Sequence, residues 1–300
     1  MTLYKLQYVP VALAVRAIGA LPRPVAHGVG ILIATAVYHC HRRLRRVGLR
    51  NLELAFPEMP LKRRKKILRG VYVSLGRLLG EVCLFPRYTP ANASQIAVYQ
   101  GFENFEAAEK RCKGVLLLTG HFGGWEVGSF FHSLQGHPMQ IVVRPLDNPC
   151  LDALVARYRG LHGNRMIGKD EFARGLLKAM HRNATVGILM DTNMIPRQGV
   201  FVDFFGIPAC TPGGLARVAL HTDATVVPAF TIWDAVLRKY RVEFGPPVEL
   251  VRTGDVEADT TANTAKFTRI IEDYVRRYPD QWLWVHRRWK TRPGDEPGLY

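Results

Sequence analysis

A histidine and a glutamate lie five residues apart in the glycine-rich segment His121-Phe-Gly-Gly-Trp-Glu126, directly after the apolar run 115–119. Near neutral pH an imidazole can take a proton from an attacking hydroxyl, and a carboxylate on its other nitrogen fixes the tautomer and stabilises the imidazolium. The attacking hydroxyl can belong to the substrate, so the pair predicts a catalytic dyad without an enzyme nucleophile. The alternative is a histidine that caps a helix, with Glu126 beside the helix dipole.

The spacing of this pair restricts where the two residues can lie. Residues five apart in a continuous helix point about 140° away from each other, so a fully helical segment would separate them. We therefore expect His121 in a turn at the carboxyl end of a strand and Glu126 in the first turns of the next helix. Gly120, Gly123 and Gly124 would give the turn its conformational freedom. This edge of a sheet is where α/β proteins usually bind ligands.

The rest of the chain supplies strands and helices for such a sheet. From about residue 95 onward, short β-rich runs alternate with helical stretches, which indicates an α/β fold with a mixed, largely parallel central sheet flanked by helices. The expected strands are 96–99, 115–119, 140–143, 185–190, 225–231 and 240–244. The expected helices are 102–111, 125–134, 150–161, 170–181, 212–221 and 261–278. Thr211 would cap the helix that begins at Pro212.

The first forty residues are apolar, but Arg16 and three prolines interrupt them, which leaves 25–38, between Pro24 and His39, as the main apolar stretch. That stretch is too short to span a bilayer as a helix. We therefore expect two short amphipathic or re-entrant helices that lie on or dip into a membrane. The alternative is a helical hairpin that packs on the protein's own core.

The chain is strongly basic, with 41 Lys and Arg against 25 Asp and Glu and a net charge of +16. Within residues 39–70, eleven basic residues are opposed only by Glu53 and Glu58. Such a cluster after an apolar hairpin suits anionic membrane lipids, where each basic residue contributes about 1 kcal/mol. Nucleic acid is the disfavoured alternative, because no nucleic-acid-binding motif accompanies the cluster. A solvated face is the remaining one.

The five cysteines are far apart and include no Cys-x-x-Cys pair, so they predict reduced thiols and no zinc, iron–sulfur or redox site. A hydrophobic fraction of 48% is enough to bury a large core and excludes a disordered chain. The last residues, 293–300, contain proline and glycine and are expected to be frayed.

The residues described above resemble the lysophospholipid acyltransferase superfamily, and within it the lipid A biosynthesis (lauroyl/myristoyl) acyltransferases and the related phosphatidylinositol mannoside acyltransferase. His121-Phe-Gly-Gly-Trp-Glu126 matches the family's His-x4-Asp/Glu hallmark. Other segments that are similar to family blocks are 51–57, 143–149, 202–212, 226–228 and 284–289. The similarity therefore extends over most of the chain.

This resemblance implies a membrane-associated O-acyltransferase of the EC 2.3.1 type. It would move a fatty acyl group from a thioester of acyl carrier protein or coenzyme A to a hydroxyl of a glycolipid or phospholipid, in the first place a lipid A precursor. His121 would be the general base and Glu126 its orienting partner, with no metal or other cofactor. The enzyme would lie on the cytoplasmic face of the bacterial inner membrane as a peripheral or monotopic protein.

Three other functions remain as alternatives. An acyl-CoA-dependent phosphatidylinositol mannoside or lysophospholipid acyltransferase would share the chemistry and differ in the acceptor. A non-catalytic membrane-binding scaffold would share the fold, but such a protein is expected to lose the dyad, which this sequence keeps. A thioesterase or esterase is disfavoured because the chain has no Gly-x-Ser-x-Gly motif.

The resemblance also implies residues that bind the substrate. Arg144 matches the family's arginine and would hold an acceptor phosphate, the alternative being a surface ion pair. Asp191 is retained from the family's Asp-Gln pair, but Thr192 and Asn193 depart from it. Asp191 and Asn193 are placed among the substrate-binding candidates. The Asp-x-Asp metal site of glycosyltransferases is a weaker interpretation of them, because one acid is missing.

The segment around residue 208 contributes the last candidates. Phe204 and Phe205 are expected to pack near the acyl channel, with a purely structural role as the alternative. Thr211 and Gly213 could form an oxyanion-binding or helix N-terminal surface for the thioester or a phosphate, or simply cap the helix. Together with the earlier expectations, this divides the chain into a membrane anchor with a basic collar (1–50), an α/β acyltransferase domain (51–292) and a frayed tail (293–300).

Overall fold

The computed structural model describes residues 2–168 and 172–300. Its nine strands are β1 (Ala97–Gln100), β2 (Val115–Thr119), β3 (Gln140–Val143), β4 (Arg165–Gly168), β5 (Thr185–Leu189), β6 (Gly199–Phe204), β7 (Ile207–Pro212), β8 (Thr225–Asp234) and β9 (Lys239–Phe244). Seven of the described strands form one sheet in the order β1-β9-β8-β2-β5-β3-β4, and β6 and β7 form a separate hairpin. Within the large sheet the β8–β9 pair is antiparallel and the other pairs are parallel. The expected α/β fold with a mostly parallel sheet is confirmed.

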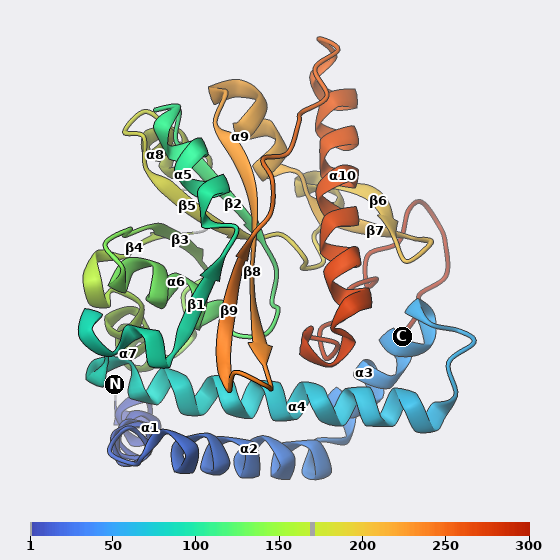
Figure 1. The fold of residues 1–300 in the computed structure, drawn as a ribbon. Helices are drawn as coiled ribbons and strands as arrows, with labels where there is room; N and C mark the ends of the chain where they lie inside the picture. Colours follow the sequence, from blue (N-terminus) through green and yellow to red (C-terminus); the bar gives the residue numbers. More distant parts are fainter. Residues whose placement is uncertain (1, 169–171) are drawn as a thin grey trace.

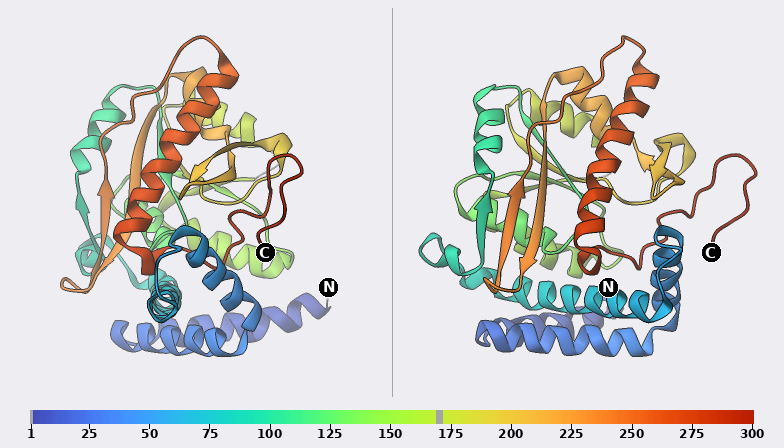
Figure 2. Two further views of the ribbon diagram at one scale, coloured as in Figure 1. Left: turned by 90° about the vertical axis from the view of Figure 1, so that its right-hand side faces the viewer. Right: turned by 45° about the vertical axis from the view of Figure 1, so that its right-hand side comes forward.

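Helices cover both faces of this sheet and extend below it. They are α1 (Thr2–Gly19), α2 (Arg23–Cys40), α3 (Arg42–Ala55), α4 (Leu61–Leu84), α5 (Phe102–Lys110), α6 (Trp125–Leu134), α7 (Pro149–Arg159), α8 (Phe172–Met180), α9 (Gly214–Thr222) and α10 (Val256–Arg277). Helix α4 crosses below the sheet, and the arrow of β8 points toward it (Figure 1). Helices α1 and α2 form an outer layer on the far side of α4, as the turned views also show (Figure 2).

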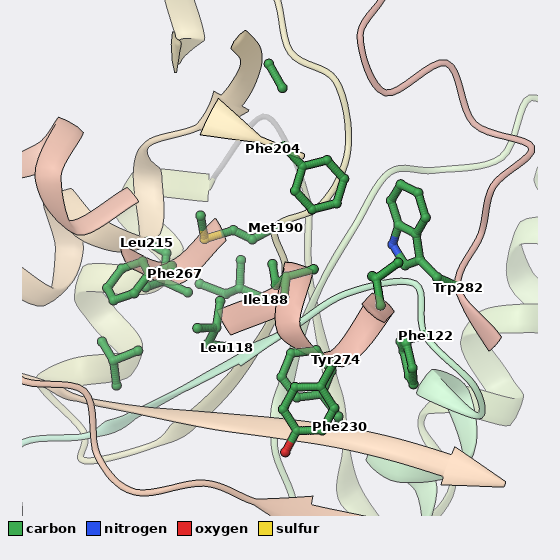
Figure 3. Packing of buried hydrophobic residues seen from close by; sticks show 14 of the residues in the cluster. Leu118, Phe122, Ile188, Met190, Phe204, Leu215, Phe230, Phe267, Tyr274 and Trp282 are labelled. Atoms are coloured by element: carbon green, nitrogen blue, oxygen red, sulfur yellow. The ribbon is translucent and has the colours of Figure 1, made fainter. Parts of the chain in front are cut away.

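Alternate residues of the strands build two separate hydrophobic clusters. Leu116 and Leu118 of β2 belong to the cluster that packs against α8, α9 and α10, whereas Leu117 belongs to the cluster against α5 and α6. This is the two-residue period of a strand that is covered on both faces. The first cluster is rich in large aromatic side chains, including the stacked rings of Phe230 and Tyr274 (Figure 3).

Helix α9 begins later than the sequence predicted. Pro212 is the last residue of β7 and pairs with Gly199 of β6, so Thr211 lies in a strand and does not cap a helix. Gly213 is the N-cap residue instead. The prediction was wrong because Thr-Pro also suits the end of an edge hairpin, and only the pairing with β6 decides between the two. The start of the predicted helix 170–181 lies outside the described residues, and α8 covers its remainder.

The N-terminal helices are docked on the protein through α4. A Cβ atom at Gly30 of α2 would lie 2.1 Å from the carbonyl oxygen of Gly76 in α4, so the two backbones touch there. Beside this contact, the buried Glu81 carboxylate of α4 accepts hydrogen bonds from the Arg23 and His27 side chains of α2. The inner face of the hairpin formed by α1 and α2 therefore packs on the protein's own core. This was the alternative to helices that only lie on or dip into a membrane.

The outer face of the same hairpin carries exposed apolar side chains. Leu6 and Leu32 are each 71% exposed. The other large apolar side chains exposed on α1 and α2 are Tyr4, Val9, Val11, Leu13, Val25, Ile33 and Val37. None of the helices in residues 2–168 and 172–300 is both long enough and apolar enough to cross a membrane.

The C-terminal tail differs from the frayed end that was expected. The Leu299 carbonyl accepts a hydrogen bond from Arg50, and the Tyr300 hydroxyl donates one to the side chain of Asn51. Both partners lie in α3, far away in the sequence, so the composition of the tail alone could not indicate them. The expected boundary after residue 50 also falls inside α3, whose Asn51 binds the carbonyl of Trp284 near the C-terminus.

Candidate active site

His121 lies in the turn between β2 and α6, at the carboxyl end of the strand, as the spacing predicted. Three backbone N–H groups hold this turn: His121 donates to Asp191 Oδ2 (2.8 Å), Gly123 to the Gln281 carbonyl (2.7 Å) and Gly124 to the Thr231 carbonyl (2.9 Å). Gly123 has φ +52°, and a Cβ atom there would lie 2.0 Å from the Thr231 carbonyl oxygen. Position 123 therefore requires glycine. The three hydrogen bonds fix the backbone of the turn.

The imidazole of His121 is bound to a carboxylate from the neighbouring strand. Thr119 and Leu189 are paired in register, so the residues that follow β2 and β5 lie side by side. Asp191 Oδ1 is 2.9 Å from His121 Nδ1, and its Oδ2 also accepts a 2.7 Å hydrogen bond from Trp282 Nε1. Burial opposes ionisation of Asp191, but the charge and hydrogen bonds of His121 and Trp282 lower its pKa to about 2. The Asp191 carboxylate is therefore ionised at neutral pH.

This contact fixes the protonation of the ring. An ionised carboxylate can only accept, so Nδ1 of His121 carries the proton and Nε2 has the free lone pair of a base. Burial alone would lower the pKa of His121, but the charge and hydrogen bond of Asp191 raise it above its ordinary value. His121 is thus a stronger base than an isolated histidine, and its orientation is fixed.

Glu126 does not fill the position that the sequence predicted. Its carboxylate accepts two hydrogen bonds from the guanidinium of Arg159, at 2.9 and 2.5 Å, and the carboxylate hydrogen-bonded to His121 is that of Asp191. Glu126 does lie in the first turn of α6, as expected. From there it pairs with the last turn of α7, whereas Nδ1 of His121 is bound at the end of β5. Glu126 is still close enough for its charge to raise the pKa of His121.

A cavity of about 390 Å³ opens beside His121, between the sheet and α6. Ionisable side chains at its mouth are His121, Glu126, Arg144 and Arg159. Apolar side chains and glycines dominate the remainder, among them Leu117, Gly128, Met139, Ile141, Gly187, Leu189, Ala229, Val242 and Phe244. A base at the charged mouth of an apolar cavity suits a substrate with a reactive polar group and a long hydrocarbon chain.

Residues 2–291 match the family model described as bacterial lipid A biosynthesis acyltransferase. The chain belongs to this family. Membership makes it an acyltransferase of the EC 2.3.1 type and confirms the family resemblance inferred from the sequence motifs.

Individual members of the family are similar along nearly the whole chain. A lipid A biosynthesis lauroyltransferase of Escherichia coli (strain K12) is 29% identical over 286 residues, which is 93% of this chain and 90% of that protein. A lipid A biosynthesis palmitoleoyltransferase of the same strain is 27% identical over 281 residues, again 93% of this chain and 90% of that protein. A lipid A biosynthesis acyltransferase of Haemophilus influenzae is 29% identical over 290 residues, or 95% of this chain and 91% of that protein.

Of the other candidates in this acyltransferase, Arg144 is exposed at the mouth of the cavity. Phe204 and Phe205, which were expected to pack near an acyl channel, are not among the described residues that line this cavity. They lie in the cluster on the opposite face, where the Phe204 ring is 5.4 Å from that of Trp282 (Figure 3). The purely structural alternative accounts for them.

Thr211, Gly213 and Asn193 also lie outside the described lining of the cavity. The Thr211 hydroxyl donates to the Ala209 carbonyl and accepts from the buried guanidinium of Arg288. The Asn193 side chain binds Thr291, and its backbone N–H donates to His286. Thr211 and Asn193 thus fasten the C-terminal segment to β7 and to the loop after β5.

Two features of the site were missed by sequence reasoning. Arg159 carried no signal, because an arginine near the end of a helix is ordinary. Asp191 was a candidate, but for contact with the substrate, since nothing in the sequence shows that β5 lies next to β2. Among residues 2–168 and 172–300, no group of three or more His, Cys, Asp and Glu side chains is placed to hold a metal ion.

Proposed function

We propose that this enzyme transfers a fatty acyl group from an acyl thioester to a hydroxyl of a lipid A precursor, with His121 as the general base. The observation that carries the proposal is the free Nε2 of an oriented histidine at the charged mouth of an apolar cavity. In this arrangement the thioester carbonyl lies beside His121 and the acyl chain extends into the cavity.

The chemical step follows from the tautomer. The acceptor hydroxyl gives its proton to Nε2 of His121 while its oxygen bonds to the carbonyl carbon of the thioester. The tetrahedral intermediate then collapses, the carbon–sulfur bond breaks, and the leaving thiolate takes the proton from the imidazolium. Asp191 stays ionised throughout and stabilises the imidazolium that forms in between.

Stabilisation of the tetrahedral oxyanion is assigned to cationic side chains. Backbone N–H groups of the turn are already used: those of His121, Gly123 and Gly124 as described above, and that of Phe122 for the Gly120 carbonyl. Arg159, which Glu126 holds at the mouth of the cavity, is the cation we assign to this task.

The acceptor is assigned from the arginine at the mouth of the cavity and from the names of the similar proteins. Lipid A precursors carry phosphate groups, and the exposed guanidinium of Arg144 can bind a phosphate with two parallel hydrogen bonds. The similar proteins described above are named for lipid A biosynthesis. For the donor, the basic surface suits an acidic acyl carrier protein; coenzyme A is the other thioester carrier that the family resemblance implied.

We also propose that α1 and α2 lie on the cytoplasmic face of the inner membrane, with the apolar outer face described above in the bilayer. The basic residues of α3 and of the first turns of α4 form the collar that meets anionic headgroups. Asn148, just before α7, donates a hydrogen bond to the Tyr4 carbonyl of α1, so the membrane layer touches the region of the cavity mouth. A lipid acceptor could thus reach His121 from the bilayer.

The test is an acyl-transfer assay with the purified enzyme in detergent, offered thioesters of acyl carrier protein and of coenzyme A. A lipid A precursor, a lysophospholipid and a total bacterial lipid extract serve as acceptors, and the mass of the product identifies both partners. Acylation of the lipid A precursor is expected. Acylation of the lysophospholipid alone would contradict the acceptor, and hydrolysis of the thioester without any lipid product would contradict transfer.

A further inference from the structure

The relatives differ in the acyl group for which they are named, lauroyl in one and palmitoleoyl in another. Family membership therefore does not determine which chain this enzyme transfers. If the cavity holds the acyl chain, the residues that close its inner end must decide the length that fits. This step rests on the function proposed above.

The cavity has one open end and one closed end. Arg144 and Leu146 at the mouth are exposed, whereas His132, Met139 and Phe244 in the lining are buried. The closed end lies toward the amino ends of the parallel strands. Leu117 and Gly187 face each other in register there, four residues before His121 along β2, which is about 13 Å at 3.3 Å per residue.

Gly187 is an unusual residue for the centre of a sheet. It lies in β5, between β2 and β3, where glycine weakens a strand because it has no side chain to pack. Its φ is not in the left-handed region, so the backbone does not require glycine. Unlike its buried neighbours Val186 and Ile188, it keeps accessible surface, and it lines the cavity.

There is room for a small side chain at Gly187, next to the flexible side chain of Met139. A Cβ atom there would lie 3.6 Å from both Sδ and Cε of Met139, which is ordinary van der Waals contact. By contrast, a Cβ atom at Gly128, the other lining glycine, would lie 2.1 Å from Thr231 Oγ1. Gly128 is therefore needed for packing, whereas Gly187 leaves room that a methyl group could fill.

Met139 closes the cavity across this gap. It is 5% exposed, and its backbone N–H is fixed by the side chain of Asn164 at 2.9 Å. The side chain itself is unbranched and can adapt to what it meets. Beside it, the His132 ring is bound to the Tyr99 hydroxyl at 2.8 Å, and burial lowers the pKa of His132 to about 3, so this wall is neutral and rigid.

We propose that Gly187 and Met139 set the length of the acyl chain that the enzyme transfers. The absent side chain at Gly187 leaves room for the last methylenes of the chain, and Met139 limits how far they extend. A side chain at position 187 would displace those methylenes, and a smaller residue at position 139 would admit more. Hydrophobic pockets discriminate by about 10- to 200-fold for one methylene, so the shift should be large enough to measure.

The experiment is a competition among saturated acyl thioesters on one carrier, each two methylenes longer than the last, with one lipid acceptor. Mass spectrometry of the product gives the ratio of kcat/KM values for the whole series in one reaction. Gly187→Ala and, more strongly, Gly187→Val should move the preferred chain to shorter lengths, and Met139→Ala to longer ones. We expect the ratio between neighbouring lengths to change by about tenfold or more.

Two control variants separate this effect from a general disturbance of the fold. Gly168→Ala replaces another strand glycine, whose added Cβ atom meets nothing within 4 Å. Met180→Ala removes a methionine that is as deeply buried, at 3% exposure, in the cluster on the other face. Both should keep the chain-length profile of the wild type.

The outcomes distinguish this inference from the proposed function. A wild-type enzyme that acylates lipid, with the same profile in Gly187→Val and Met139→Ala, would overturn the chain-length role alone. A uniform loss of activity without a change of profile would overturn it equally. A folded wild-type enzyme that acylates no acceptor from any thioester would overturn the proposed function, and the inference with it.

Discussion

The two faces of the central sheet are built from alternate residues of the same strands, yet one is filled and the other is hollow. On the α10 side, Leu118 belongs to the cluster of Phe230, Phe267 and Tyr274, in which the Phe230 and Tyr274 rings are stacked (Figure 3). On the α6 side, Leu117 and Ala229 border the cavity. The filled face stabilises the protein, and the hollow one has the room that the proposed substrate needs. Substitutions on the two faces should therefore differ in whether they lower stability or activity.

The largest effect is expected at the mouth of the hollow face. His121→Ala should lower kcat/KM by about a hundredfold to ten-thousandfold, because the base that accepts the hydroxyl proton is removed. The protein should stay folded, because the turn is held by its backbone and Asp191 keeps its hydrogen bonds from the His121 N–H and from Trp282. Acyl transfer and urea unfolding measured on the same preparation check both parts. A substantially active, pure H121A enzyme would contradict the assignment of the base.

The next effect compares two neighbouring leucines of β2. Leu118→Ala on the filled face should lower the free energy of unfolding by about 2 to 5 kcal/mol, because it leaves a new cavity in a packed cluster. Leu117→Ala should cost less, since its side chain already borders empty space. Urea denaturation of both variants gives the difference. Equal losses would show that the α6 side is packed as tightly as the other.

Asp191 connects the two faces, because it binds His121 on one side and Trp282 of the filled cluster on the other. Asp191→Asn should lower activity by up to about ten-thousandfold, because an amide can donate to Nδ1 of His121 and favour the tautomer whose Nε2 carries the proton. Activity requires neutral His121 and is lost as pH falls through its pKa. Since Asp191 raises the pKa of His121, the variant should lose activity at a lower pH than the wild type. If the variant and the wild type lost activity at the same acidic pH, this role of Asp191 would be contradicted.

The smallest effect concerns the contact that brings α6 against the sheet. Gly128→Ala should destabilise the protein, because its Cβ atom would lie 2.1 Å from Thr231 Oγ1. Thr231→Ala removes that atom, so the double variant should recover part of the loss, with an interaction energy of about 0.5 to 1 kcal/mol. Additive losses in a double-mutant cycle would mean that the clash is relieved elsewhere.

The sequence predicted the layers of the fold better than the contacts between them. The run 115–119 indicated a buried strand, and the glycines after it indicated a turn that carries His121. Which face would be filled could not be predicted, because Leu117 and Leu118 have the same chemistry and differ only in what packs against them. The same limit explains the partner of His121: Glu126 is close in the chain, whereas Asp191 becomes a neighbour only through the order of the strands.

The order in which the ribosome makes this chain gives the C-terminal contacts a further meaning. The carbonyl of Gln281 and the indole of Trp282 hold the His121 turn, and they are translated after every strand of the central sheet. Helices α1 and α2 leave the ribosome before them. The two helices are therefore complete before the turn that carries His121 can be locked in place.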